Sequence, residues 1–214
     1  MHLNTFIDHT LLKPAATPED IIKLCIEALE YEFYGVCVNS CYVKLASNEL
    51  HHSQVKVIST IGFPLGASST GAKCAEAKQC IEDGADEIDM VINVGFLKHK
   101  LYQSIQEEIS AIKKVIGSKI LKVIIETCYL TDDEKRIACQ LAAKSGADFV
   151  KTSTGFGTGG ATELDVKLMV QEVGTTMKIK ASGGIKDLAT ANKYINLGVS
   201  RIGTSSGIAI VTST

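Results

Sequence analysis

The stretch that decides the fold is Asp148-Phe149-Val150-Lys151-Thr152-Ser153-Thr154-Gly155-Phe156-Gly157 (DFVKTSTGFG), a short apolar run followed by a lysine, three hydroxyls and a glycine. Later in the chain, Lys178–Gly184 (KIKASGG) repeats the arrangement, with Lys180 in the place of Lys151. A strand buried on both faces is normally apolar along its length, so a lysine near its end needs a reason. Each stretch predicts a buried strand that runs into a polar, glycine-rich loop.

Short apolar runs of this kind occur eight times and alternate with segments of helical periodicity. Nearly continuous apolar strands are typical of a parallel sheet that helices cover. We expect strands at Phe6–Thr10, Gly35–Asn39, Val55–Gly62, Glu87–Asn93, Leu121–Thr127, Asp148–Thr154, Lys178–Gly183 and Ser200–Ser205.

Helix start signals follow several of these strands. Thr17 precedes Pro18, which places a capping hydroxyl before a proline at the first helical position. Thr131 and Glu134 have the T-x-x-E spacing of a capping box. Eight strand–helix units in a row predict a single-domain (β/α)8 TIM barrel over residues 1–214, and a doubly wound open sheet is the alternative.

The composition excludes several other classes of protein. The chain has 214 residues, of which 45% are hydrophobic and 21% charged, with a net charge of −2, so nothing in it favours nucleic-acid binding. No apolar run approaches the roughly 20 residues of a membrane helix, and no signal-peptide pattern is visible at the start. Seven cysteines without a CxxC pair suit a reducing compartment, so we expect a cytoplasmic protein that binds no membrane.

Polar residues late in the strands are the candidates for chemistry, because the active site of such a barrel lies at the carboxyl ends of its strands. Lys151 and Lys180 fall on the consecutive strands six and seven. Asp89 is a carboxylate inside an apolar strand, where it requires a cation or several donors. Asp8 raises the same question in the first strand, and Glu126 is an alternative acid at the mouth.

The two lysines predict a reactive amine. When two ammonium groups lie close together in a partly desolvated mouth, burial and the like charge both lower the lysine pKa. A neutral lysine amine attacks carbonyl groups and forms Schiff bases. The alternative is that each lysine extends from its strand end into solvent, and that Asp89 forms only a structural ion pair.

Glycine- and serine-rich loops after the last two strands predict a phosphate site. Ser182-Gly183-Gly184 follows strand seven, and Gly203–Gly207 follows strand eight. Barrels commonly bind phosphate with these two loops, through backbone N–H groups and a short helix N-terminus. Glycine and serine are common in any loop, so the placement of the pair carries the prediction.

Two further glycine motifs fit a nucleotide poorly. Gly155–Gly160 matches G-x-G-x-x-G, but the next strand ends near Lys180 instead of in the acid that a dinucleotide requires. Gly66–Lys73 resembles a P-loop, but Ala72 separates the glycine from the lysine. The histidines show no ligand spacing with acids or cysteines, so we expect neither a metal site nor a cofactor.

Four motifs together resemble the deoxyribose-phosphate aldolase family. They occur in the family's order along nearly the whole chain, and KTSTGF and KASGGI together are highly specific. The motifs are Ile7–Pro14 (IDHTLLKP), Glu87–Asn93 (EIDMVIN), Val150–Phe156 (VKTSTGF) and Lys180–Ile185 (KASGGI).

The resemblance implies a class I, metal-independent aldolase that interconverts 2-deoxy-D-ribose 5-phosphate with D-glyceraldehyde 3-phosphate and acetaldehyde. Lys151 matches the Schiff-base lysine of the family. Asp89 and Lys180 match its proton-relay pair, and Asp8 matches an aspartate that supports the relay. The residues that match the phosphate-binding loops are Gly155, Gly183, Gly184, Gly203, Ser205 and Ser206.

The sequence departs from the family pattern in two places. Some members have a lysine in the place of Phe156 that helps to hold the phosphate, so backbone amides are expected to carry more of that task here. Some members end in a tyrosine that assists proton transfer; this sequence stops at Thr214 without one, so barrel residues or water are expected to move the proton.

Other functions remain open at this point. A different class I aldolase, a sugar-phosphate isomerase and a non-catalytic sugar-phosphate-binding protein all fit a barrel with phosphate loops. A homodimer is compatible with such a barrel, although no surface patch in the sequence indicates one.

Overall fold

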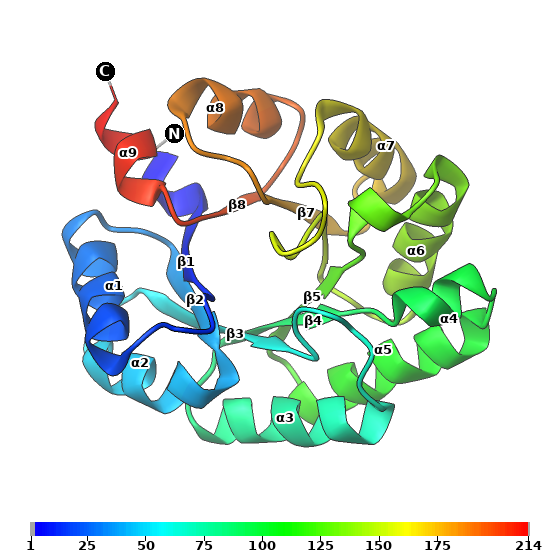
Figure 1. Ribbon diagram of the computed structural model, residues 1–214, viewed down its shortest axis with the longest axis horizontal. Coiled ribbons are helices and arrows are strands. Elements are labelled where there is room, and N and C mark those ends of the chain that lie inside the picture. The colour runs from blue at the N-terminus through cyan, green and yellow to red at the C-terminus, as the bar shows by residue number, and fades with distance from the viewer. Residues whose placement is uncertain (1–2, 214) are drawn as a thin grey trace.

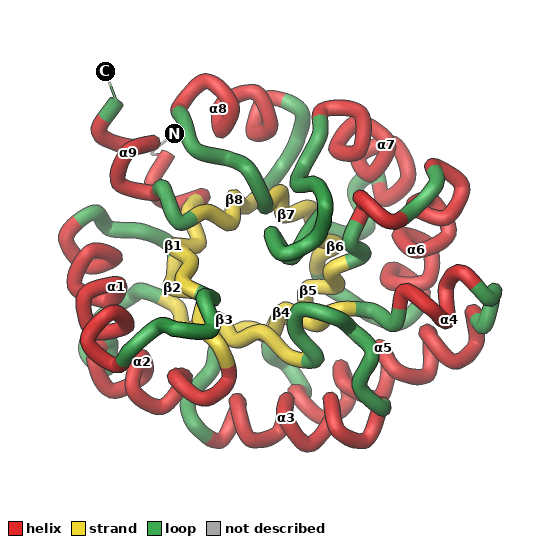
Figure 2. The backbone as a smooth tube through the Cα atoms, viewed as in Figure 1, coloured by secondary structure: helices red, strands yellow, loops and turns green. Residues whose placement is uncertain are grey.

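The strands and helices that the sequence predicts close into a barrel. The computed structural model describes residues 3–213, in which eight strands pair in parallel in chain order and β8 pairs back to β1. The strands form an inner ring with the helices outside it (Figures 1 and 2). The strands are β1 (Ile7–Leu11), β2 (Gly35–Asn39), β3 (Lys56–Ile61), β4 (Glu87–Val91), β5 (Ile120–Ile124), β6 (Phe149–Lys151), β7 (Lys178–Ser182) and β8 (Arg201–Thr204).

The predicted (β/α)8 fold is confirmed, and the open-sheet alternative is wrong because β1 and β8 are paired. Both capping signals are present: the hydroxyls of Thr17 and Thr131 each accept the backbone N–H three residues on. No helix within residues 3–213 is both long and apolar enough to cross a membrane. The α-helices are α1 (Pro18–Glu30), α2 (Val43–Glu49), α3 (Thr70–Glu82), α4 (Val94–Lys98), α5 (Tyr102–Ile116), α6 (Asp132–Lys144), α7 (Glu163–Val173), α8 (Leu188–Asn196) and α9 (Gly207–Thr212).

Several predicted strands are too long at their carboxyl ends. The run Asp148–Thr154 keeps strand geometry only over β6, so its hydroxyl residues lie in the loop at the barrel mouth. After β5, Glu126 takes a left-handed backbone conformation (φ 54°, ψ 68°) that turns the chain. After β4, the side chain of Asn93 accepts the N–H of Phe96 at 3.0 Å and caps α4. The polar residues that resemble strand ends therefore build loops and helix starts.

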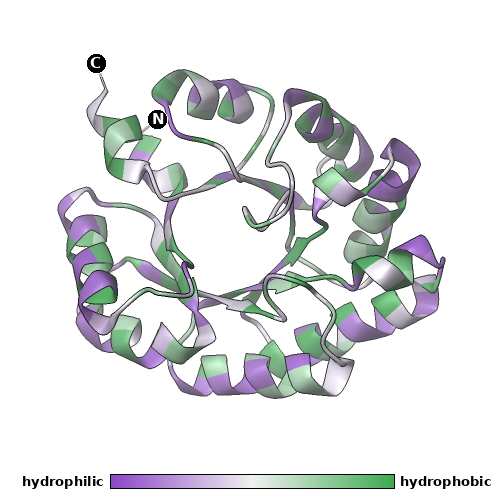
Figure 3. Cartoon of the chain, in the orientation of Figure 1, coloured by the Kyte–Doolittle hydropathy of each residue, from purple (hydrophilic) through white to green (hydrophobic). Residues whose placement is uncertain are grey.

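The strands present two different faces, because successive side chains point to opposite sides of a sheet. Ile88 and Met90 belong to the large apolar core between barrel and helices, whereas Asp89 between them contacts other charges inside the barrel. The outer helices alternate hydrophobic and hydrophilic residues along their length, as amphipathic helices do (Figure 3). The apolar core thus supports a charged interior.

Candidate active site

Charged side chains from six strands fill the barrel interior. Each has an exposed fraction of 3% or less, and the strand register places several directly beside one another, as in the pairs Asp89 with Lys122 and Lys151 with Lys180. The group, called the charge network below, consists of Asp8, Glu87, Asp89, Lys122, Lys151, Lys180 and Arg201.

Asp89 is the centre of the charge network. Its Oδ2 lies 2.8 Å from the Nζ of Lys151 and 2.8 Å from the Nζ of Lys180. Its Oδ1 lies 2.8 Å from the Nζ of Lys122. Burial alone would raise the pKa of Asp89, but the three ammonium groups hold it well below its usual range.

The remaining contacts join the network into a ring. Lys180 reaches Asp8 at 2.5 Å, and Arg201 reaches Asp8 at 3.2 Å and Glu87 at 2.6 Å. Lys122 closes the ring with a contact of 2.5 Å to Glu87. Burial would raise the pKa of Asp8 as well, but Lys180 and then Arg201 lower it. Asp8 and Asp89 are therefore ionised around neutral pH.

Lys151 is the cation with the fewest carboxylate partners in the network. Lys122, Lys180 and Arg201 each contact two carboxylates, whereas Lys151 contacts only Asp89, through an oxygen that it shares with Lys180. Within the described residues 3–213, the network holds four basic groups against three acids. If one of the four basic groups loses its proton, the network becomes neutral. Lys151 has the fewest ion-pair contacts to lose, so it is the group that gives up its proton at the lowest cost.

The pKa shifts of the two predicted lysines point in opposite directions. Burial lowers the pKa of Lys151, Asp89 opposes that effect, and the positive charge of Lys180 adds to it. Burial would lower the pKa of Lys180 too, but Asp8 and Asp89 overcome it and raise that pKa above its ordinary value. The sequence predicted a lowered pKa for at least one of the two lysines, and for Lys151 burial is a larger cause than the like charge of Lys180.

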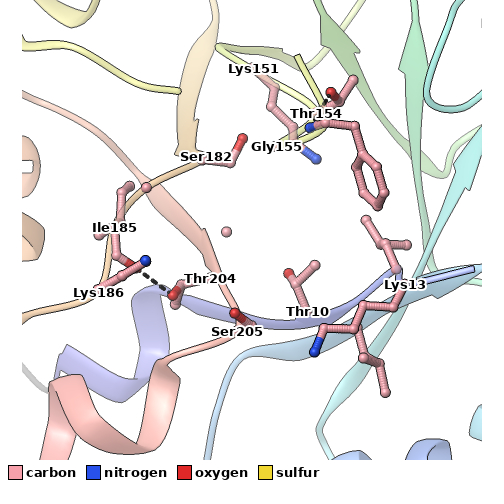
Figure 4. Close-up of a pocket in the computed structure, with 16 residues that line it drawn as sticks. Thr10, Lys13, Lys151, Thr154, Gly155, Ser182, Ile185, Lys186, Thr204 and Ser205 are labelled. Carbon is pink, nitrogen blue, oxygen red and sulfur yellow. Dashed lines mark hydrogen bonds between the residues drawn. The ribbon is translucent and has the colours of Figure 1, made fainter. Parts of the chain in front are cut away.

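A cavity of about 250 Å³ opens over Lys151 at the carboxyl ends of the strands (Figure 4). Of the predicted phosphate residues, Ser206 does not line it: its N–H donates to the Oγ1 of Thr204 at 2.9 Å. The other five do, namely Gly155, Gly183, Gly184, Gly203 and Ser205.

At two of these glycines, a larger residue would collide with neighbouring atoms. Gly183 has φ +85°, and a Cβ on it would lie 2.9 Å from the Cα of Gly160. A Cβ on Gly203 would lie 3.0 Å from the Cε of Lys180, so this glycine leaves room for the buried lysine. Gly203 therefore shapes the charge network as well as the wall of the cavity.

Two lysines line the cavity that the sequence did not single out. Lys13 follows β1, and Lys186 lies in the loop between β7 and α8; both are exposed, and Figure 4 shows them on opposite sides of the cavity. Phe156, which is 49% exposed, lines the cavity as well and packs edge-on against Phe63 at 5.4 Å. The cavity thus has positive side chains in addition to backbone amides.

The sequence analysis also missed three members of the charge network. Glu87, Lys122 and Arg201 each lie in a strand, and all three point inward. A signal existed, because Glu87 and Asp89 are two residues apart and so share one face of β4. Glu126, the alternative acid, bonds instead to Thr154.

The described residues contain no cluster of potential metal ligands: no group of three or more His, Cys, Asp or Glu side chains among them could hold a metal ion.

Comparison with known proteins gives close relatives of one kind. The model of the DeoC/LacD family aldolases matches residues 3–212. A deoxyribose-phosphate aldolase of Coprothermobacter proteolyticus is 57% identical over 211 residues, which cover 99% of this chain and 96% of the relative. One from Thermococcus kodakarensis is 59% identical over 211 residues, which cover 96% of this chain and 94% of the relative.

A solved structure agrees with these relatives. The deoxyribose phosphate aldolase from Aeropyrum pernix, described as having a unique tetrameric structure, superimposes with a TM-score of 0.91 at 34% identity. The match covers 98% of this chain and 89% of that chain. Together these likenesses confirm the resemblance that the four sequence motifs predict.

Proposed function

The chain belongs to the DeoC/LacD family of aldolases, and from that premise we propose how its buried charges carry out aldol chemistry. The protein is a class I aldolase that reversibly cleaves 2-deoxy-D-ribose 5-phosphate to D-glyceraldehyde 3-phosphate and acetaldehyde. Lys151 forms the Schiff base. One observation carries this assignment: of the four cations in the charge network, Lys151 has the fewest carboxylate contacts and lines the cavity.

The reaction begins with the neutral amine of Lys151. Its Nζ attacks the aldehyde carbon of the open-chain sugar, and loss of water gives an iminium ion. A base removes the proton of the C3 hydroxyl, the C2–C3 bond breaks, and its electron pair moves into the iminium to give an enamine. D-Glyceraldehyde 3-phosphate leaves at this point. Protonation of the enamine carbon and hydrolysis then release acetaldehyde and the free amine.

The neighbours of Lys151 keep the charges in place during these steps. Asp89 stays ionised among its three lysines and lies 2.8 Å from the Nζ that becomes the iminium nitrogen, so it stabilises the positive charge there. Lys180 and Asp89, through a water, carry protons between substrate and solvent. Asp8 holds Lys180 in its protonated form. Positioned acid–base groups typically contribute about 10²–10⁴-fold to a rate.

The phosphate of the substrate binds at the far side of the same cavity. The loops after β7 and β8 offer backbone N–H groups at Gly183 and Gly184 and the hydroxyl of Ser205. Lys13 and Lys186 supply the positive charge that Phe156 does not. This assignment adds two cations to the expectation that backbone amides carry more of that task.

The test is a coupled assay with 2-deoxy-D-ribose 5-phosphate, followed by trapping with acetaldehyde and borohydride. The account predicts turnover, and reduction of the imine adds one ethyl group to the peptide that contains Lys151. A sugar-phosphate isomerase would use a carboxylate base and leave every lysine unmodified. A non-catalytic binding protein would retain the ligand without Lys151 and show no turnover.

The surroundings in which the enzyme works are part of the proposal. Its partners are the sugar phosphate and the aldehydes, and neither nucleic acid nor a membrane is among them. The seven cysteines are free in the structure, which suits a reducing cytoplasm. A homodimer stays a prediction, which sedimentation of the purified protein tests.

A further inference from the structure

Glu126 is a buried acid at the barrel mouth that the proposed mechanism does not use. Its exposed fraction is 3%, and it lies just after β5 with a left-handed backbone, which is unfavourable for a residue with a side chain. Both of its carboxylate oxygens bond to one residue, Thr154: Oε1 accepts the backbone N–H at 3.1 Å, and Oε2 accepts the hydroxyl proton in a short hydrogen bond. A strained, buried acid aimed at a single loop residue indicates a dedicated contact.

The contact continues into the loop that forms the cavity wall. The hydroxyl of Thr154 donates a hydrogen bond to Glu126. The same hydroxyl oxygen accepts a hydrogen bond from the N–H of Phe156, at 3.0 Å. The two segments are also joined through their backbones, since the N–H of Thr127 donates a hydrogen bond to the carbonyl of Thr152 at 3.0 Å. The segment 154–156, called the β6 loop below, is thereby tied to the residues after β5 through Thr154 itself and through the backbone of Thr152 just before it.

The chain passes close to Glu126 immediately after the β6 loop, at Gly157. A Cβ added to Gly157 would lie 2.7 Å from the Sγ of Cys128 and 3.2 Å from the Cδ of Glu126. The loop also divides two hollows, because Thr154 and Phe156 line both the cavity over Lys151 and a second, mainly apolar cavity of about 210 Å³ beside it. The position of this loop therefore decides the shape of the substrate cavity.

We propose that Glu126 is a positioning residue, which acts through Thr154 to hold the β6 loop as the substrate-facing wall of the active-site cavity. Glu126 does not take part in the chemistry, since both of its oxygens accept hydrogen bonds from Thr154, and Lys151 donates its hydrogen bond to Asp89. The wall it fixes includes Gly155, next to the predicted phosphate site. This inference rests on the proposed function, because it assigns the loop to binding of the phosphorylated substrate.

Glu126→Gln is the sharpest variant, because it preserves size and removes one acceptor. A glutamine can still accept the N–H of Thr154, but its amide group would face the hydroxyl and donate to it, which leaves the hydroxyl proton without its acceptor. Thr154→Val removes the hydroxyl, and with it the bonds to Glu126 and to Phe156. Thr154→Ser keeps the hydroxyl. Ser59→Ala is the matched control, since it removes a buried hydroxyl on the outer face of β3, next to Cys80.

The experiment measures KM and kcat for 2-deoxy-D-ribose 5-phosphate, and the rate of borohydride trapping with acetaldehyde, which has no phosphate. Glu126→Gln and Thr154→Val are each expected to raise KM by about tenfold while trapping stays within about threefold of the parent. Thr154→Ser is expected to have the KM of the parent enzyme, because it keeps the hydroxyl. Ser59→Ala is expected to have the parent KM as well.

The proposal is overturned if Glu126→Gln and Thr154→Val leave KM unchanged, or if trapping falls as far as substrate binding does. If Glu126→Gln fails to fold, as judged by thermal unfolding, Thr154→Val with its serine rescue decides the matter. Failure of the proposed function would look different, because the unaltered enzyme would then form no adduct with acetaldehyde.

Discussion

Two regions of the molecule bury a lysine, and only one of them suits catalysis. Lys73 lies between α3 and α5 with an exposed fraction of 0%, and Lys151 lies at the barrel mouth with 2%. Burial is the first cause that lowers the pKa of each. A depressed pKa is therefore shared by both lysines and does not by itself identify the reactive one.

The two sites differ in partners and in access. Lys73 contacts Glu108 at 2.7 Å and the carbonyl of Val91 at 2.8 Å, and a Cβ on Gly62 would lie 2.7 Å from its Cε. Lys151 shares its only carboxylate oxygen with Lys180 and lines a cavity. A buried amine can therefore act as a nucleophile where it shares its carboxylate partner with another cation and where a substrate can reach it.

Lys151→Leu gives the largest effect on activity. Without the amine no Schiff base forms, so turnover of 2-deoxy-D-ribose 5-phosphate is expected to fall by more than about 10⁴-fold. The coupled assay measures turnover, and mass spectrometry after borohydride trapping measures the adduct. An adduct that persists on another lysine, with activity retained, would place the chemistry elsewhere.

Lys180→Met is expected to lower kcat by about 10²–10⁴-fold and to change the pH dependence of the remainder. Without the positive charge of Lys180, Lys151 no longer shares the carboxylate oxygen of Asp89 with another cation. The pKa of Lys151 is therefore expected to rise. Since only the neutral amine reacts, kcat/KM is lost as the pH falls through that pKa. The acid limb of the pH profile should therefore move to higher pH; a limb that stays in place would mean that Lys180 does not tune Lys151.

Lys73→Met tests the other side of the comparison. It leaves Glu108 buried without its cation, so the free energy of unfolding is expected to fall by about 3–5 kcal/mol. Denaturant titration measures this loss, and the double variant Lys73→Met/Glu108→Leu should recover much of it. Trapping with acetaldehyde should be unaffected in the folded fraction. A selective loss of trapping would give Lys73 a role in the reaction.

Lys13→Met and Lys186→Met have the smallest expected effects. Both side chains are exposed, so each should raise KM for the phosphorylated substrate by only about two- to fivefold, and less at high salt. Trapping with acetaldehyde serves as the control, because that substrate has no phosphate. An equal effect on trapping would show that these lysines do not act through the phosphate.

The sequence predicts the fold and the centre of the site because both depend on local patterns. Nearly continuous apolar runs, capped helices and the paired lysine stretches are visible in the residues themselves, and so Asp8, Asp89, Lys151 and Lys180 were found together. The sequence could not show that Lys122 takes a share of Asp89, because that contact depends on strand register across the barrel.

Packing between helices and local backbone geometry account for the other features that the sequence did not show. Lys73 lies in a stretch that resembles a P-loop, and only the packing of α3 on α5 shows that it meets Glu108. The role of Glu126 follows from a turn in its backbone, since a continued strand would not aim its carboxylate at Thr154 in the same way. Ser206 lies outside the cavity lining, and its predicted role in phosphate binding stays a prediction.

The central claim is that Lys151 is uncharged near neutral pH because it is buried and has only a shared carboxylate. The rate of borohydride trapping with acetaldehyde, followed against pH at the peptide that contains Lys151, measures this most directly. We predict a rate that reaches its plateau well below the ordinary lysine pKa of about 10.4. A rate that keeps rising through that value would contradict the account.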